Sequence, residues 1–201
     1  LTRLIATALA VILGIGFLAS GLMLTDAMRS GLTGDVEEQY KNVDFAIIAT
    51  AGSDQSGGMD FQLTVPASAL ATARSTPGVE AAAGEIQADA RVLRADGTTV
   101  NLRSQGRSWI ADSELNPLSL DEGSAPKGSA QVVLDRKLAT EAGVSVGDTV
   151  SVQTPAGTKQ FKVSGISSFG RQDALDDGGT ISFSEETAVQ VLNAGTPGFS
   201  D

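Results

Sequence analysis

The sequence contains no cysteine and no histidine. Without cysteine, neither a disulfide framework nor thiol redox chemistry is available to the chain. Without histidine, it lacks the commonest general base and the commonest transition-metal ligand at neutral pH, and a serine nucleophile lacks its usual activating partner. Aromatic residues make up only 4% of the sequence, which leaves few stacking surfaces for sugars or bases. These absences argue against most hydrolases and against binders of flat ligands.

Basic clusters and nucleotide-binding motifs are also missing. The 14 basic residues stand against 24 acidic ones, which gives a formal net charge of −10. Association with a phosphate backbone depends on clustered lysine and arginine, so nucleic acid is not an expected partner. No Gly-x-x-x-x-Gly-Lys stretch occurs, so we expect any nucleotide hydrolysis to belong to a partner protein.

The sequence does contain a long uncharged segment, Leu4 to Thr25, between Arg3 and Asp26. A helix needs about 20 apolar residues to cross a bilayer, so we expect a transmembrane helix within residues 1–25 and a lipid bilayer as a partner. Arg3 on the short side favours an extracytoplasmic location from about residue 26 onward. The alternative is a secretory signal peptide, whose apolar region usually runs only about 7 to 15 residues.

Beyond this span, apolar residues keep helical spacing as far as Val36, which predicts an extracytoplasmic stalk over residues 26–42. Residues 43–201 are then expected to form an extracytoplasmic domain. The sequence begins with leucine rather than methionine, and it stops at Asp201 with few residues after its last predicted helix. We therefore expect a longer gene product and a domain that is truncated on its C-terminal side.

The pattern along the domain predicts an α+β fold with β-hairpins, short helices and two subdomains. In its first half we expect a strand over 43–50, a loop over 52–59, a helix over 67–74 that begins after Pro66 and stops at Pro77-Gly78, and a strand near Val79. The dipeptide Asp96-Gly97 predicts a tight hairpin turn between 90–94 and 98–103. Residues 104–127 show no sustained period and are expected to be irregular.

The second half has stronger signals. We expect a buried strand over 132–134, followed by a helix over 136–142 with Asp135 as its N-cap and Gly143 as its stop. A second hairpin is expected over 149–154 and 159–164. A strand over 180–183 and a helix from Ser184 to Leu192 complete the predicted domain.

This second half carries a recurring sequence pattern. Its parts are the strand and helix start Val132–Ala139 (VVLDRKLA), the turn Gly143–Val150 (GVSVGDTV) and the strand Phe161–Ile166 (FKVSGI). The pattern resembles the extracytoplasmic core domain of ABC transporter permeases of the macrolide-exporter and FtsX-like type. The resemblance implies a domain between the first and second membrane spans of a permease, with Gly143 and Gly147-Asp148 serving as scaffold.

The same resemblance implies a function. It suggests the first span and outer domain of a permease subunit, which couples ATP hydrolysis by a partner ABC ATPase subunit to export or extraction of a hydrophobic or peptide-like substrate. A second permease copy, or a related permease, is the other implied partner. The alternative is a stand-alone membrane-anchored binding or sensing module, and an enzyme is the least favoured class.

Clustered acidic residues are the remaining candidates for a site. Asp173, Asp176 and Asp177 precede a Gly-Gly turn, but their spacing does not match a calcium-binding loop and favours a solvated loop. Glu37-Glu38 and Asp121-Glu122 are interpreted as exposed faces rather than acid/base pairs. The sequence therefore assigns no catalytic, cofactor-binding or metal-binding residue, and no cofactor.

Overall fold

A computed structural model describes residues 65–94, 96–170, 172–175 and 178–193 of the chain, with 42–47 and a few single positions besides. The chain divides into two compact units, Leu1–Gln39 and Tyr40–Asp201. Of the first unit only Phe17, Ser20, Gly21 and Met23 are described, and they are helical. The predicted span and stalk therefore lie almost wholly outside the described residues. Within those residues, no helix has the length and hydropathy that a membrane crossing requires.

The described part of the second unit is built on one mixed sheet. Its strands are β1 (Gln87–Asp89), β2 (Arg91–Leu93), β3 (Ser104–Ser108), β4 (Leu118–Gly123), β5 (Gln131–Asp135), β6 (Thr149–Thr154), β7 (Gly157–Phe169) and β8 (Gly179–Phe183). Hydrogen-bonded neighbours follow the order β1-β3-β8-β5-β7-β6-β2, and β4 pairs with the second half of β7. The pairs β3–β8 and β5–β7 are parallel, and the others are antiparallel.

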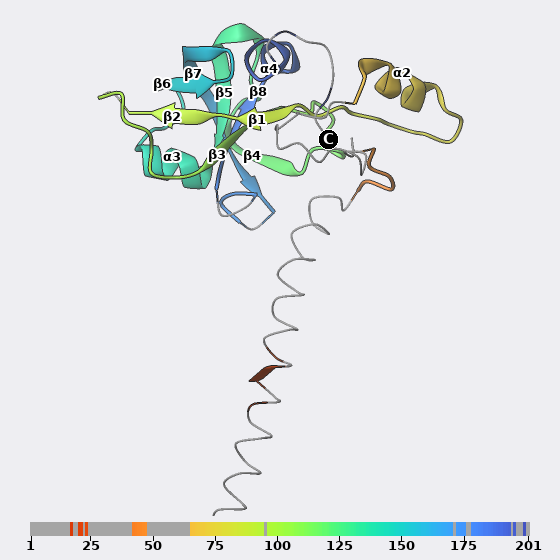
Figure 1. The fold of residues 1–201 in the computed structure, drawn as a ribbon, viewed down its shortest axis with the longest axis horizontal. Helices are drawn as coiled ribbons and strands as arrows, with labels where there is room; N and C mark the ends of the chain where they lie inside the picture. The colour runs from red at the N-terminus through yellow and green to blue at the C-terminus, as the bar shows by residue number, and fades with distance from the viewer. Residues whose placement is uncertain are drawn as a thin grey trace, which may run out of the picture. The chain divides into compact units, whose positions relative to one another are not determined.

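The two ends of this order meet, because Ala90 alone separates β1 from β2 along the chain (Figure 1). β1 pairs with β3, and β2 pairs with β6, so one nearly continuous strand joins both ends of the sheet. The Ser104 hydroxyl donates a hydrogen bond to the Ala90 carbonyl (2.6 Å), which satisfies the backbone at the break. The sheet is therefore closed on itself.

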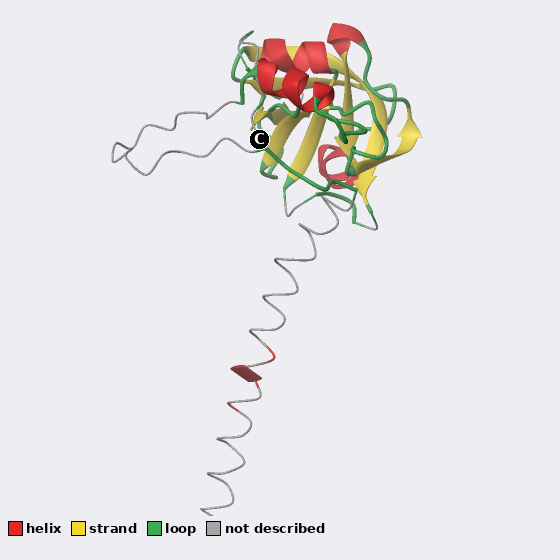
Figure 2. Ribbon diagram, turned by 90° about the vertical axis from the view of Figure 1, so that its right-hand side faces the viewer, coloured by secondary structure: helices red, strands yellow, loops and turns green. Residues whose placement is uncertain are grey.

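The strands curve around an apolar interior (Figure 2). Inside it, the rings of Phe161 and Phe183 pack edge to face with their centroids 5.2 Å apart. Two short helices, α3 (Arg136–Ala142) and α4 (Glu185–Val191), contribute Leu138, Ala188 and other residues to the same core. This core takes residues from β1, β2, β5, β6, β7 and β8. Residues 40–201 form one compact unit rather than the two predicted subdomains.

Both core helices begin as the sequence predicts. The Asp135 carboxylate accepts a hydrogen bond from the Leu138 amide (2.6 Å), and Gly143 ends α3 in the left-handed conformation (φ 68°). Ser184 caps α4, whose first turn carries two glutamates that suit the helix dipole. The strand β8 and the hairpin of β6 and β7 are likewise confirmed.

A third helix, α2 (Ala67–Ser75), follows Pro66 as predicted and ends before Pro77. None of its residues is buried, and it stands beside the sheet rather than in the core (Figure 1). The prediction of a strand near Val79 is wrong, because the chain stays irregular until β1 begins at Gln87. Val79 is 40% exposed, so a single apolar residue after a turn was not a sufficient strand signal.

Other expectations for the first half also need correction. Residues 43–47 of the strand expected over 43–50 are not in a strand, and Phe45 is 91% exposed, because no neighbouring strand pairs with this described stretch. The Asp96-Gly97 turn is confirmed, with Gly97 at φ 81°. The predicted hairpin around it, however, is reduced to one isolated bridge, which pairs Leu93 with Thr99.

The largest correction concerns residues 104–127. The sequence predicts an irregular connection there, whereas the structure contains both β3 and β4. β3 has the sequence Ser-Gln-Gly-Arg-Ser and is buried at four of its five positions, which places polar residues inside the sheet. Hydrophobic periodicity has no means of detecting such a strand.

Candidate functional site

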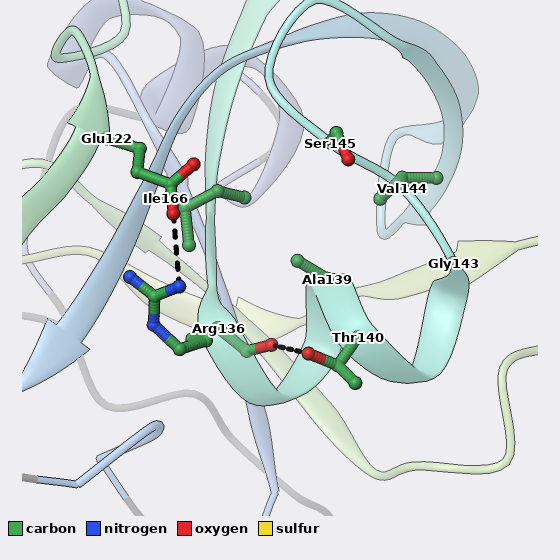
Figure 3. A pocket seen from close by; sticks show the side chains of 8 residues that line it. All are labelled: Glu122, Arg136, Ala139, Thr140, Gly143, Val144, Ser145 and Ile166. Carbon is green, nitrogen blue, oxygen red and sulfur yellow. Dashed lines mark hydrogen bonds and ion pairs between the residues drawn. The ribbon is translucent and has the colours of Figure 1, made fainter.

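A cleft of about 320 Å³ opens between α3, β4 and β7 (Figure 3). Its volume is at the lower end of the range of small-molecule pockets. Its lining consists of Glu122, Arg136, Ala139, Thr140, Gly143, Val144, Ser145 and Ile166. The charged groups of Glu122 and Arg136 lie at one end beside Ile166, and Gly143, Val144 and Ser145 lie at the other end.

The position of α3 creates the cleft. The carboxylate of Asp135, fully buried, accepts the Leu138 amide at the helix start and the Thr180 amide of β8. These bonds fix the first turn of α3 against the sheet, with Arg136 as the first helical residue. After Gly143, the turn is held by the Ser145 amide, which donates to the Asp148 carboxylate (2.9 Å). The cleft therefore has a rigid frame on its helical side.

A β-bulge in β4 supplies its acidic end. The pairing with β7 shifts register between Leu120 and Glu122, so Asp121 is the extra residue. Adjacent residues of a regular strand point to opposite faces, whereas a bulge re-aims a side chain. Here both Asp121 and Glu122 reach the same guanidinium, that of Arg136, at 2.9 and 3.1 Å.

These contacts form an ion-pair cluster around Arg136. Asp173 adds a longer contact at 3.9 Å, and the Ser168 hydroxyl donates to Asp121 (2.9 Å). Hydrogen bonds from Arg136 to Asp121 and then Glu122 raise the pKa of the guanidinium above its ordinary value. Because Arg136 is 39% exposed, solvent screens these pairs, and they fix geometry more than they add stability.

The acidic pairs named from sequence have different outcomes. The interpretation of Asp121-Glu122 as an exposed face is confirmed, since both residues are exposed, and the structure adds that both carboxylates contact Arg136. Asp173 joins the same cluster, while Asp176, Asp177 and the pair Glu37-Glu38 lie outside the described residues. In the part of the chain that the structure describes, no group of three acidic side chains is arranged to hold a metal ion.

Ser145 lies at the centre of residues 143–147 (GVSVG), which have the Gly-x-Ser-x-Gly spacing of a nucleophile elbow. That elbow connects a strand to a following helix, whereas this run follows α3 and precedes β6. No histidine exists in the sequence to act as its base. The spacing therefore reflects a helix stop and a turn, with Gly147 at φ 101°.

The closed sheet, the two core helices and the turn at Gly147 define a compact α/β domain. The family model of the MacB-like periplasmic core domain matches residues 4–194. The chain belongs to this family, which confirms the resemblance to MacB-like and FtsX-like ABC permeases. It is thus an ABC transporter permease component with an extracytoplasmic domain. No curated protein shows a significant match to the chain.

Proposed function

We propose that this chain is the first span and outer domain of a permease subunit that couples ATP hydrolysis by a partner ATPase to movement of a hydrophobic or peptide-like substrate. The match of the family model over residues 4–194 carries the proposal, because it includes both the apolar segment and the sheet. The substrate is exported or extracted at the outer surface, and a second permease copy completes the transporter.

The described structure supports a mechanical role for the domain. Its closed sheet surrounds an apolar core, in which Val132, Leu134 and Phe183 are fully buried. Packed interiors transmit displacement because they deform little. A domain of this kind moves as one body when the residues that connect it to the membrane move.

The sequence supports a complex in which the partner hydrolyses ATP and this domain binds and moves. No Gly-Lys dipeptide, and hence no Walker A motif, occurs in the 201 residues, so ATP is hydrolysed by the partner. The cleft beside α3 provides apolar surface, a carboxylate that is paired with Arg136, and the hydroxyls of Thr140 and Ser145, which have no histidine to activate them. The domain therefore binds and moves rather than catalyses.

The test is affinity purification of the full-length gene product from detergent-solubilised membranes, followed by mass spectrometry and an ATPase assay. We expect a Walker-containing ATPase to co-purify, with turnover that falls when this chain is depleted. A partner whose Walker lysine is replaced serves as the control for contaminating ATPases. Recovery of the chain without any ATPase would contradict the proposal and favour a stand-alone anchored binding or sensing module.

A further inference from the structure

Two segments at opposite ends of the described sheet unit meet at Val65 and Phe199. These residues form an isolated antiparallel bridge outside the named strands. The Val65 amide donates to the Phe199 carbonyl (2.6 Å), and the Phe199 amide donates to the Val65 carbonyl (2.9 Å). Both backbone hydrogen bonds of an antiparallel hydrogen-bonded pair are therefore present, although neither residue belongs to a named strand.

The side chain of Phe199 adds a second attachment. A Cβ atom built on Gly84 would lie 2.7 Å from the ring carbon Cγ of Phe199, and closer still to two other ring atoms. Real Cβ atoms do not approach so closely, so the ring occupies the space that a side chain at position 84 would need. Phe199 also packs against the main hydrophobic core. Glycine at position 84 is thus required for the ring to lie there.

The chain on which the ring rests is itself fixed to a central strand. Glu85, the residue after Gly84, forms an ion pair with Arg107 of β3, which is only 4% exposed. Ile86 donates its amide to the Ser108 hydroxyl (3.0 Å) and accepts the Ser108 amide (2.9 Å). A continuous path of contacts therefore joins Phe199 to the middle of the sheet.

We propose that Val65, Gly84 and Phe199 form a clasp that fixes the polypeptide entering the sheet and the polypeptide leaving it to β3, so that both segments and the sheet move as one body. The clasp stays closed while the transporter works. This inference rests on the proposed function, in which the domain lies between two membrane spans. Phe199 is then a positioning residue for the coupling step, and the bridge is the joint through which both connections act.

The substitution Gly84→Ala tests the clasp directly. The backbone of Gly84 does not adopt a positive φ, so alanine meets no backbone strain, and the three atoms nearest to its methyl group all belong to the ring. Hydrogen exchange of the full-length protein in detergent, read by mass spectrometry, reports the opening of the bridge at the Val65 and Phe199 amides. We expect exchange there to accelerate on the order of tenfold, while peptides of β5 and β8 keep their protection.

Two further variants separate the clasp from general damage. Ala83→Ser adds one atom at the neighbouring exposed residue and is expected to leave exchange unchanged. Phe199→Ala is expected to open the bridge by itself, and adding Gly84→Ala to it should have no further effect, because the added methyl group then meets no ring. Unchanged exchange in Gly84→Ala, or additive effects in the double variant, would overturn the clasp.

The functional measurement uses the same variants in the purified transporter complex. We expect Gly84→Ala to lower the ATPase turnover of the complex while complex assembly stays at the wild-type level, with Ala83→Ser as the control. Equal turnover in Gly84→Ala and wild type, despite an opened bridge, would overturn the coupling role of the clasp. If the wild-type chain recruits no ATPase, the proposed function fails, and the exchange experiment still decides whether the clasp exists.

Discussion

The strands β3 and β5 occupy similar places in the sheet but are buried by different means. Each lies between two other strands, β3 between β1 and β8 and β5 between β8 and β7. In β5, the consecutive residues Val132, Val133 and Leu134 have no exposed surface. In β3, the residues inside the protein are serine, glycine and arginine. One sheet thus contains an apolar strand and a polar strand in equivalent surroundings.

The difference shows what a polar strand needs in order to be buried. The Ser104 hydroxyl donates to the Ala90 carbonyl, and the Ser108 hydroxyl accepts the Ile86 amide. Arg107 is paired with Glu85, which offsets part of the cost of removing its charge from water. β5 depends on the hydrophobic effect, whereas β3 depends on specific partners contributed by the segment before β2.

The largest expected effect comes from removing one of these partners. Glu85→Gln leaves the buried guanidinium of Arg107 without its counter-charge, and we expect a loss of about 3–5 kcal/mol in the free energy of unfolding. This loss in the free energy of unfolding is measured by urea unfolding of the full-length protein. The fluorescence of Trp109, the one tryptophan in the sequence, reports the unfolding.

The matched control replaces both partners. Glu85→Leu combined with Arg107→Met removes the charges together, and such pairs often match the stability of the original ion pair. We expect the double variant to recover most of the loss. A single variant as stable as wild type would show that β3 does not depend on the pair.

The corresponding test in β5 is Leu134→Ala. Its side chain is fully buried, so the substitution removes apolar contacts and leaves a cavity, with an expected loss of about 2–5 kcal/mol by the same urea measurement. Leu120→Ala in β4 is the matched control, because Leu120 is 39% exposed and should lose much less. Similar losses at the two leucines would contradict the view that burial stabilises β5.

The same contrast explains which parts of the fold the sequence reveals. α3 and α4 are predictable because each combines an apolar pattern with its own capping residue, Asp135 or Ser184. β5 is predictable because it contains a short continuous apolar run. β3 is not predictable, because its burial depends on Glu85, which lies far away along the chain. The reverse error occurs at 43–50, where apolar residues suggested a strand and the described part, 43–47, has no strand partner.

The cleft could not be predicted from the sequence, for a related reason. Arg136 is separated by more than ten residues from Asp121 and Glu122, and no short motif links them. Both carboxylates reach the guanidinium only because β4 contains a bulge, which hydrophobic patterning does not signal. The turn at Gly147 and the helix stop at Gly143 could be predicted, since glycine is needed locally at both positions.

The smallest of the three expected effects tests how tightly β3 is packed. A Cβ atom at Gly106 would lie 2.5 Å from Cδ2 of Leu192 and 2.9 Å from Cβ of Ala90. Gly106→Ala therefore forces neighbouring groups apart, and we expect a loss of about 1–3 kcal/mol in the urea experiment. If the contact with Leu192 is the cause, the loss should shrink in a Leu192→Ala background, because the shortened side chain leaves room for the methyl group. Fully additive losses would instead show that Ala90 and Phe183 set the limit, and that glycine in β3 is required by the closure of the sheet rather than by the residue that follows α4.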